Sequence, residues 1–164
     1  MRTQHDDEYI RVLIADDDEH VLQAYREAFS DTESTQEIRA LDALAAELFE
    51  PNDASNDEPH FDVVACSQGN DAIDLARQAA NEGNPFDVII LDVRMPPGID
   101  GVEAGSQIRE LDPDVEIVFV TGFSDMPIEE LQRRVPPPLK LHYFNKPLSF
   151  SQLARDVASM VREH

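Results

Sequence analysis

The chain has 164 residues, of which 41 % are hydrophobic, so it can form one domain with an ordinary apolar core and leaves little room for a second. Its 34 acidic and 13 basic residues give a formal charge of −21, which argues against direct nucleic-acid binding. The polar N-terminal segment, the lack of any run near the roughly 18 apolar residues that span a bilayer, and a single cysteine, Cys66, predict a soluble cytoplasmic protein without membrane contact.

Short runs rich in Val, Ile and Phe alternate along the chain with segments whose apolar residues recur at helical spacing. The runs VIIL and IVFV are continuously apolar, which is typical of strands buried on both faces of a parallel sheet. The predicted strands are Ile10–Ala15, Asp62–Cys66, Asp87–Leu91, Val115–Val120 and Lys140–Phe144. The alternation predicts an α/β fold, a doubly wound (βα)5 domain.

Helix signals separate these strands. Asp17 or Asp18 can cap a first helix whose apolar positions run from Val21 to Phe29. The further helices are expected at about Gly69–Gly83, Ile99–Leu111, Pro127–Val135 and Ser149–Val161. The third must end before Pro113, because proline disfavours helical geometry in the residue before it.

One segment, Asp31–His60, is too long for an ordinary connection between the first helix and the second strand. Apolar residues at helical spacing predict an extra amphipathic helix at about Gln36–Phe49, followed by a polar, acidic loop. Two interpretations stay open for this insert. The helix packs on its own domain, or it forms a partner-docking or dimerising surface.

Polar side chains follow four of the predicted strands: Asp16 and Asp17 the first, Asp92 the third, Thr121 the fourth and Lys146 the fifth. In an open parallel α/β sheet the carboxyl ends of the strands line one crevice, so these residues are expected to share one site.

Carboxylates in this pattern are suited to magnesium and to phosphoryl chemistry. Asp16, Asp17 and Asp92 supply the hard oxygen ligands that Mg²⁺ takes, although an Asp16-Asp17-Asp18 run by itself is more typical of a solvated turn and helix cap. With a metal bound, one carboxylate can attack a phosphoryl group, and Asp92 is the best candidate because it stands singly after the most apolar strand. Lys146 and Thr121 could then contact the phosphoryl oxygens.

Four stretches resemble the receiver domains of two-component response regulators: VLIADDDEHVLQAY, DVIILDVRMPPGIDGVE, VFVTG and YFNKP. The resemblance covers nearly the whole chain except the Asp31–His60 insert. It implies a flavodoxin-like five-stranded parallel sheet of order 2-1-3-4-5, with the extra helix inserted between the first helix and the second strand. Residues 1–164 are then one receiver domain, made of 8–30, the insert 31–60, and 61–164.

The resemblance also implies roles for the site residues. Asp92 would accept a phosphoryl group from a phosphohistidine on a histidine kinase or a histidine phosphotransfer protein. Asp16, Asp17, Asp92 and the backbone carbonyl of Arg94 would hold Mg²⁺.

The remaining roles concern signalling. Thr121 and Lys146 would contact the phosphoryl oxygens, and Tyr143 would be the switch aromatic that turns inward on activation. The face formed by the family's fourth helix, fifth strand and fifth helix would carry the signal, as a homodimer interface or toward an effector domain after residue 164.

Two departures from the family pattern and two alternative functions complete the prediction. Met95–Gly101 is one residue longer than the commonest form of its turn, and RRVPPPLKLHYF replaces a short connection, so the preceding helix is expected to be repositioned. A haloacid-dehalogenase-type Mg²⁺-dependent phosphohydrolase would need an acid where this chain has Arg94. A pseudo-receiver that docks partners without phosphorylation would not need the intact residue set. We therefore expect a regulatory domain and not an enzyme.

Overall fold

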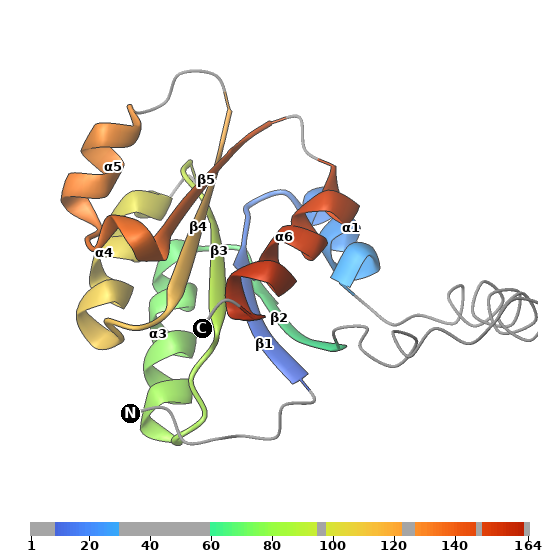
Figure 1. Ribbon diagram of the computed structural model, residues 1–164, viewed down its shortest axis with the longest axis horizontal. Coiled ribbons are helices and arrows are strands. Elements are labelled where there is room, and N and C mark those ends of the chain that lie inside the picture. Colours follow the sequence, from blue (N-terminus) through green and yellow to red (C-terminus); the bar gives the residue numbers. More distant parts are fainter. Residues whose placement is uncertain (1–8, 30–59, 95–97, 123–126, 147–148, 163–164) are drawn as a thin grey trace, which may run out of the picture.

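The computed structural model describes residues 9–29, 60–94, 98–122, 127–146 and 149–162 (Figure 1). Strands and helices alternate through them as predicted. In chain order they are β1 Tyr9–Ala15, α1 Glu19–Phe29, β2 His60–Cys66, α3 Gly69–Asn81, β3 Val88–Asp92, α4 Gly101–Leu111, β4 Glu116–Thr121, α5 Ile128–Arg134, the 3-10 helix η1 Pro138–Lys140, β5 Leu141–Asn145 and α6 Phe150–Arg162.

The five strands form one parallel sheet in the order β2-β1-β3-β4-β5, which confirms the predicted fold and strand order. Helices α1 and α6 cover one face of the sheet, and α3, α4 and α5 cover the other (Figure 1). Every residue of β3 and β4 is buried, as the continuous apolar runs predicted.

Alternate residues of each central strand enter different cores. Leu13, Ile89 and Phe119 belong to the cluster beneath α3, α4 and α5, whereas their neighbours along the strands pack beneath α1 and α6. Side chains alternate across a strand, so the sheet separates two apolar layers. The two layers fix the strands and leave their carboxyl ends to carry polar side chains.

The observed boundaries differ from the predicted ones by one or two residues. β3 extends to Asp92, so this carboxylate ends the strand and does not follow it. α4 begins at Gly101 and not at Ile99, because the Asp100 side chain accepts a hydrogen bond from the backbone N–H of Glu103, at 2.8 Å, and caps the helix. Asp18 is likewise the residue that caps α1, by accepting from the N–H of His20 at 2.9 Å.

The predicted extra helix Gln36–Phe49 lies outside the described residues, and so does the acidic loop up to the start of β2 at His60. Both stay predictions. The segment that was expected to reposition the preceding helix, residues 133–144, runs from the end of the short α5 through the 3-10 helix η1 into β5. The repositioning of α5 stays a prediction.

Candidate functional site

Three carboxylates meet where β1 and β3 end. These strands are neighbours in the sheet, with Ala15 paired to Leu91, so Asp16 and Asp17 come to lie beside Asp92. One oxygen atom from each of the three side chains lies within 4.8 Å of the others. Asp16 and Asp92 are 1 % and 6 % exposed, while Asp17 faces solvent. The structure therefore brings together three acids that the sequence placed after two separate strands.

Lys146 reaches this group from the far side of β4. Its ammonium nitrogen lies 3.1 Å from Oδ2 of Asp92 and 3.9 Å from Oδ2 of Asp16. The backbone N–H of Lys146 donates to the carbonyl of Thr121 at 2.9 Å, which extends the β4–β5 ladder by one bond. The ladder thus holds the lysine opposite the end of β3.

Thr121 is the last residue of β4 and is buried beside the site. Its hydroxyl donates to the carbonyl of Gly122 at 2.8 Å. Before the Thr121 hydroxyl could donate to a bound oxyanion, its O–H would have to rotate away from the carbonyl of Gly122. The structure thus puts Thr121 at the predicted place with its hydroxyl directed along its own backbone.

The site carries more negative than positive charge. The pKa of Asp16 is raised from 3.8 to about 6, mainly by burial and also by the charges of Asp92 and Asp17, which together outweigh the opposing effects of the Asp18 N–H and of Lys146. Burial alone would lower the pKa of Lys146, but its hydrogen bond to Asp92 and the nearby carboxylate charges outweigh that effect and raise it. Three carboxylates therefore share one ammonium group.

These residues fit a hard divalent cation. Oδ2 of Asp16 is buried and accepts no hydrogen bond within the described part of the chain, although Oδ1 accepts from the N–H of Asp18 at 2.9 Å. A buried oxygen without a donor and a carboxyl group with a raised pKa are both stabilised by a bound cation. Oxygen ligands alone suit Mg²⁺. The N–H of Arg94 donates to Oδ1 of Asp92 at 3.2 Å, which brings the main chain of Arg94 beside the same carboxylate.

Gly101, the first residue of α4, lies against the backbone of Asp92, and this role was not predicted from the sequence. Its N–H donates to the carbonyl of Val93 at 2.8 Å. A Cβ atom built on Gly101 would lie 1.9 Å from the carbonyl oxygen of Asp92, so only glycine lets α4 start this close to the end of β3. The Asp100-Gly101 pair was the available sequence signal for this glycine, but a sequence pattern does not show that the backbone of Asp92 packs against it.

Tyr143 lies in β5, opposite Phe119 in the register. Its ring is partly buried and packs against the apolar cluster beneath α3, α4 and α5, while the next residue, Phe144, packs on the other face. Tyr25 of α1 is an aromatic residue near Asp16 and Asp92 that the sequence did not single out. Burial, together with the charges of Asp16 and Asp92, raises the pKa of its phenol.

The sequence of this chain matches one protein family over more than half its length. Residues 52–157 match the response regulator receiver domain. The chain belongs to this family. The match begins after β1 and therefore does not include Asp16 and Asp17. In the structure β1 lies between β2 and β3, so the two residues that follow it belong to the same receiver fold.

Curated relatives of this receiver domain are bacterial signalling proteins. The response regulator receiver protein CpdR of Brucella abortus is 30 % identical over 77 residues, which are 47 % of this chain and 61 % of CpdR. The transcriptional regulatory protein DctD of Pseudomonas aeruginosa is 28 % identical over 122 residues, 74 % of this chain and 19 % of DctD. The matching part of the sensor kinase CckA of Brucella abortus is 63 % of this chain and 10 % of CckA, at 27 % identity. The chain thus spans from a tenth to about three fifths of these relatives.

Solved structures share the receiver fold. A response regulator receiver protein from Sinorhizobium medicae superposes with a TM-score of 0.62 at 22 % identity, covering 94 % of this chain and 96 % of that one. The response regulator TrrA of Thermotoga maritima, solved in complex with Mg²⁺ and BeF, gives a TM-score of 0.58 at 21 % identity, covering 92 % of this chain and 98 % of TrrA.

Among the described helices, none is long and apolar enough to cross a bilayer.

The raised pKa of Asp16 predicts a pH-dependent response to Mg²⁺. Between its ordinary value of 3.8 and about 6 the folded protein holds a proton on Asp16 that the unfolded chain has lost, so the contribution of this residue to stability falls as the pH rises through that window. Mg²⁺ competes with that proton. We expect the rise in melting temperature caused by Mg²⁺ to be larger at about pH 7.5 than at about pH 5.

Asp16→Asn should reduce this rise and make it nearly independent of pH. Asp74→Asn, which removes an exposed carboxylate on α3, is the matched control and should behave like the wild type. An equal rise at both pH values in the wild-type protein would show that Asp16 does not take part in metal binding.

Proposed function

We propose that this receiver domain accepts a phosphoryl group on Asp92 from a phosphohistidine of a histidine kinase or a histidine phosphotransfer protein. The observation that carries the proposal is the position of the Asp92 carboxylate, which ends β3 between two further acids and the ammonium group of Lys146, 3.1 Å away. A carboxylate with a cationic neighbour and a ready metal site is equipped to form an aspartyl phosphate.

The proposed reaction moves one phosphoryl group without net oxidation. An oxygen of Asp92 attacks phosphorus, the bond from phosphorus to the donor imidazole nitrogen breaks, and that nitrogen keeps the electron pair. Lys146 neutralises charge on the transferred oxygens, and Thr121 donates to one of them once its hydroxyl leaves the carbonyl of Gly122. Mg²⁺, when held by Asp16, Asp17, Asp92 and the carbonyl of Arg94, offsets the negative charge of donor and acceptor.

The signal would pass from the site to the face formed by α5, β5 and α6. Tyr143 lies on β5, three residues before Lys146, so a shift of the lysine toward a phosphoryl group displaces the strand that carries the aromatic. Phosphorylation acts as a switch if it favours one of two packings of this face. A second copy of the domain or an effector domain is the proposed receiver of the signal, and the cytoplasm is the proposed location.

Labelling with acetyl phosphate tests the proposal. In the presence of Mg²⁺ the intact mass should rise by one phosphoryl group, the label should be lost in base, and chelation of Mg²⁺ should prevent its formation. A wild-type protein that folds and binds Mg²⁺ yet takes up no label would refute the phosphoacceptor role and favour a pseudo-receiver. Repeated release of phosphate from a sugar phosphate would favour a phosphohydrolase, against which Arg94 stands as the residue two positions after Asp92.

A further inference from the structure

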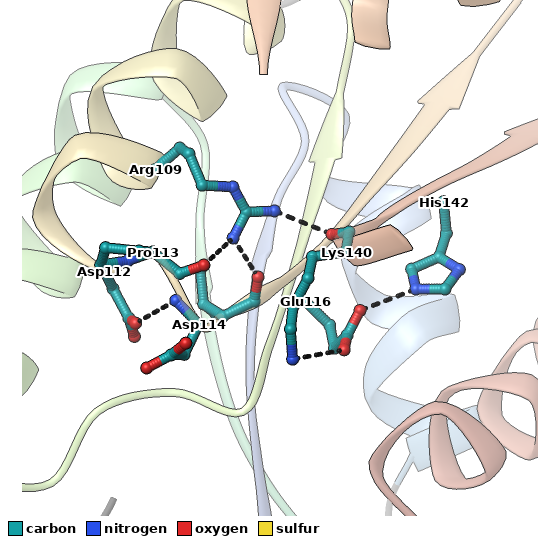
Figure 2. Close-up of polar contacts among 8 residues, drawn as sticks. Arg109, Asp112, Pro113, Asp114, Glu116, Lys140 and His142 are labelled. Carbon is teal, nitrogen blue, oxygen red and sulfur yellow. Dashed lines mark hydrogen bonds and ion pairs between the residues drawn. The ribbon is translucent and has the colours of Figure 1, made fainter. Parts of the chain in front are cut away.

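A second polar cluster lies at the opposite end of the sheet, where β4 and β5 begin (Figure 2). It contains Arg109 from the last turns of α4, Glu116 at the start of β4, Lys140 at the end of η1 and His142 in β5. We call these four residues the amino-end clamp. The clamp is remote from Asp92, and the reaction proposed above gives none of its four residues a role.

Arg109 joins three backbone segments. Its side chain is 7 % exposed, and its guanidinium group donates to the carbonyls of Pro113, at 3.2 Å, of Val115, and of Lys140, at 2.8 Å. Burial lowers its pKa, against the opposing charges of Glu116, Asp112 and Asp114. Only a guanidinium fork can donate in several fixed directions at once, so the residue fastens the start of β4 and the start of β5 to α4.

Glu116 adds a second link between the same two strands. The side chain of this buried β4 residue is 3 % exposed, and its two oxygens lie 2.8 Å from Nε2 of His142 and 3.4 Å from Nζ of Lys140. Burial would raise the pKa of Glu116, but the hydrogen bonds and charges of these two partners outweigh it and lower the pKa. The carboxylate stays ionised and pairs the beginning of β5 with β4.

The clamp matters because much of the chain that leads from the buried Val135 into β5 is exposed. β5 is an edge strand that pairs with β4 alone among the described strands. In this lead, Pro136 and Pro137 are exposed and Leu139 is 88 % exposed. Its proline residues also have no N–H to donate. The first residue of the strand, Leu141, pairs with Ile117 and packs on the apolar cluster, and the polar contacts hold the residues directly before it.

The same strand delivers Lys146 to the site. Lys146 lies six positions after Lys140, a distance of about 20 Å along an extended chain. At the other end of α4, Gly101 abuts the backbone of Asp92. These contacts link α4 and β5 at both of their ends. At one end the start of α4 lies against the backbone of Asp92, and the ammonium of Lys146, which follows β5, lies 3.1 Å from the Asp92 carboxylate. At the other end Arg109 of α4 donates to the carbonyl of Lys140, which precedes β5.

We propose that Arg109 is a positioning residue: by anchoring the start of β5 to α4 it sets the place of that strand along β4 and so holds the ammonium of Lys146 at Asp92. This inference rests on the proposed function, because it gives Arg109 an indirect role in phosphoryl transfer. The anchoring of β5 by Arg109 does not itself depend on a phosphoryl donor.

Arg109→Met tests the proposal because it keeps the apolar stem and removes the fork. Among folded molecules, the rate of labelling by acetyl phosphate should fall by about 10- to 100-fold, the effect of a small displacement of a reacting group. Arg77→Met is the matched control, since Arg77 is an exposed α3 residue whose described partner is Asp74, and it should label like the wild type. Where Arg109→Met does not fold, Arg109→Lys takes its place, because lysine keeps the charge without the fork.

A double variant separates positioning from general destabilisation. If Arg109 acts through Lys146, adding Arg109→Met to Lys146→Ala should lower the labelling rate no further. Multiplied effects of the two substitutions, or a wild-type rate in folded Arg109→Met, would overturn the proposal.

Hydrogen exchange gives a readout that needs no phosphoryl donor. In Arg109→Met the amides of β5 and the Lys146 N–H, which donates to the carbonyl of Thr121, should exchange faster, while those of β3 keep wild-type protection. A wild-type protein that fails to label would refute the proposed function, and exchange alone would then decide the anchoring role. Unchanged exchange in β5 would refute that role even if the wild type labels.

Discussion

Asp92→Asn should abolish labelling by acetyl phosphate, with a loss of at least about 100-fold, because an amide has no carboxylate oxygen to attack phosphorus. The substitution keeps the shape of the side chain. The amide oxygen can still accept from the N–H of Arg94, which donates to Oδ1 of Asp92 at 3.2 Å. Intact-mass spectrometry after incubation with the donor and Mg²⁺ measures the effect directly.

The same variant should remain folded, and in the absence of metal it should lose less stability than substitution of a buried charged residue usually causes. Asp92 is one of the charges that raise the pKa of Asp16, so removing it relieves repulsion between the two buried carboxyl groups. Asp74→Asn, at an exposed position of α3, should label normally. Labelling of Asp92→Asn at the wild-type rate would move the phosphoacceptor to another residue. If Asp92→Asn does not fold, Asp92→Ala takes its place, because alanine also lacks the carboxylate.

Gly101→Ala should destabilise the domain by at least about 3 kcal/mol, which places it among the most damaging single substitutions. The added Cβ would lie 1.9 Å from the carbonyl oxygen and 2.8 Å from the carbonyl carbon of Asp92. Both neighbours are backbone atoms of a strand end that is fixed in the sheet, so α4 itself must move. Urea unfolding measures the loss of free energy, and labelling of the remaining folded protein should also be slower because Asp92 is displaced.

Gly98→Ala is the matched control in the same connection. Its added Cβ would meet the side-chain oxygen of Gln68, at 2.7 Å, and the flexible end of this partly exposed side chain can move away. We expect a change of no more than about 1 kcal/mol. Equal losses at positions 98 and 101 would mean that the glycines are needed for the conformation of the loop and not for the approach of α4 to Asp92.

The fold was predictable because its signals are local. Runs such as VIIL and IVFV indicate strands buried on both faces, and the predicted strand ends lie within one or two residues of the observed ones. The site followed from the same reasoning, since Asp16, Asp92 and Lys146 each stand at or just after the end of a strand, and parallel strands bring such ends together. Their chemical roles stay predictions.

Other features depend on distances between segments that no local pattern encodes. Glu116 at the start of a strand is typical of a surface charge, yet it is buried because Lys140 and His142, more than twenty residues later, supply its partners. Arg109 near the end of a helix is typical of an exposed cation that stabilises the helix terminus. Only the packed structure shows its fork directed at the carbonyls that precede β4 and β5.

The central position of β1 has a consequence for how the chain is made. Arg11 of this strand bonds to residues 51 and 76 positions further on, in or next to the two strands that flank β1. At about 5–20 residues per second, a growing chain leaves both edges of β1 unpaired for on the order of 3 to 10 seconds, the time needed to make the 51 residues up to Asp62. An apolar strand with open edges is prone to pair with other chains. The charge of −21 opposes such association during synthesis through repulsion between nascent chains.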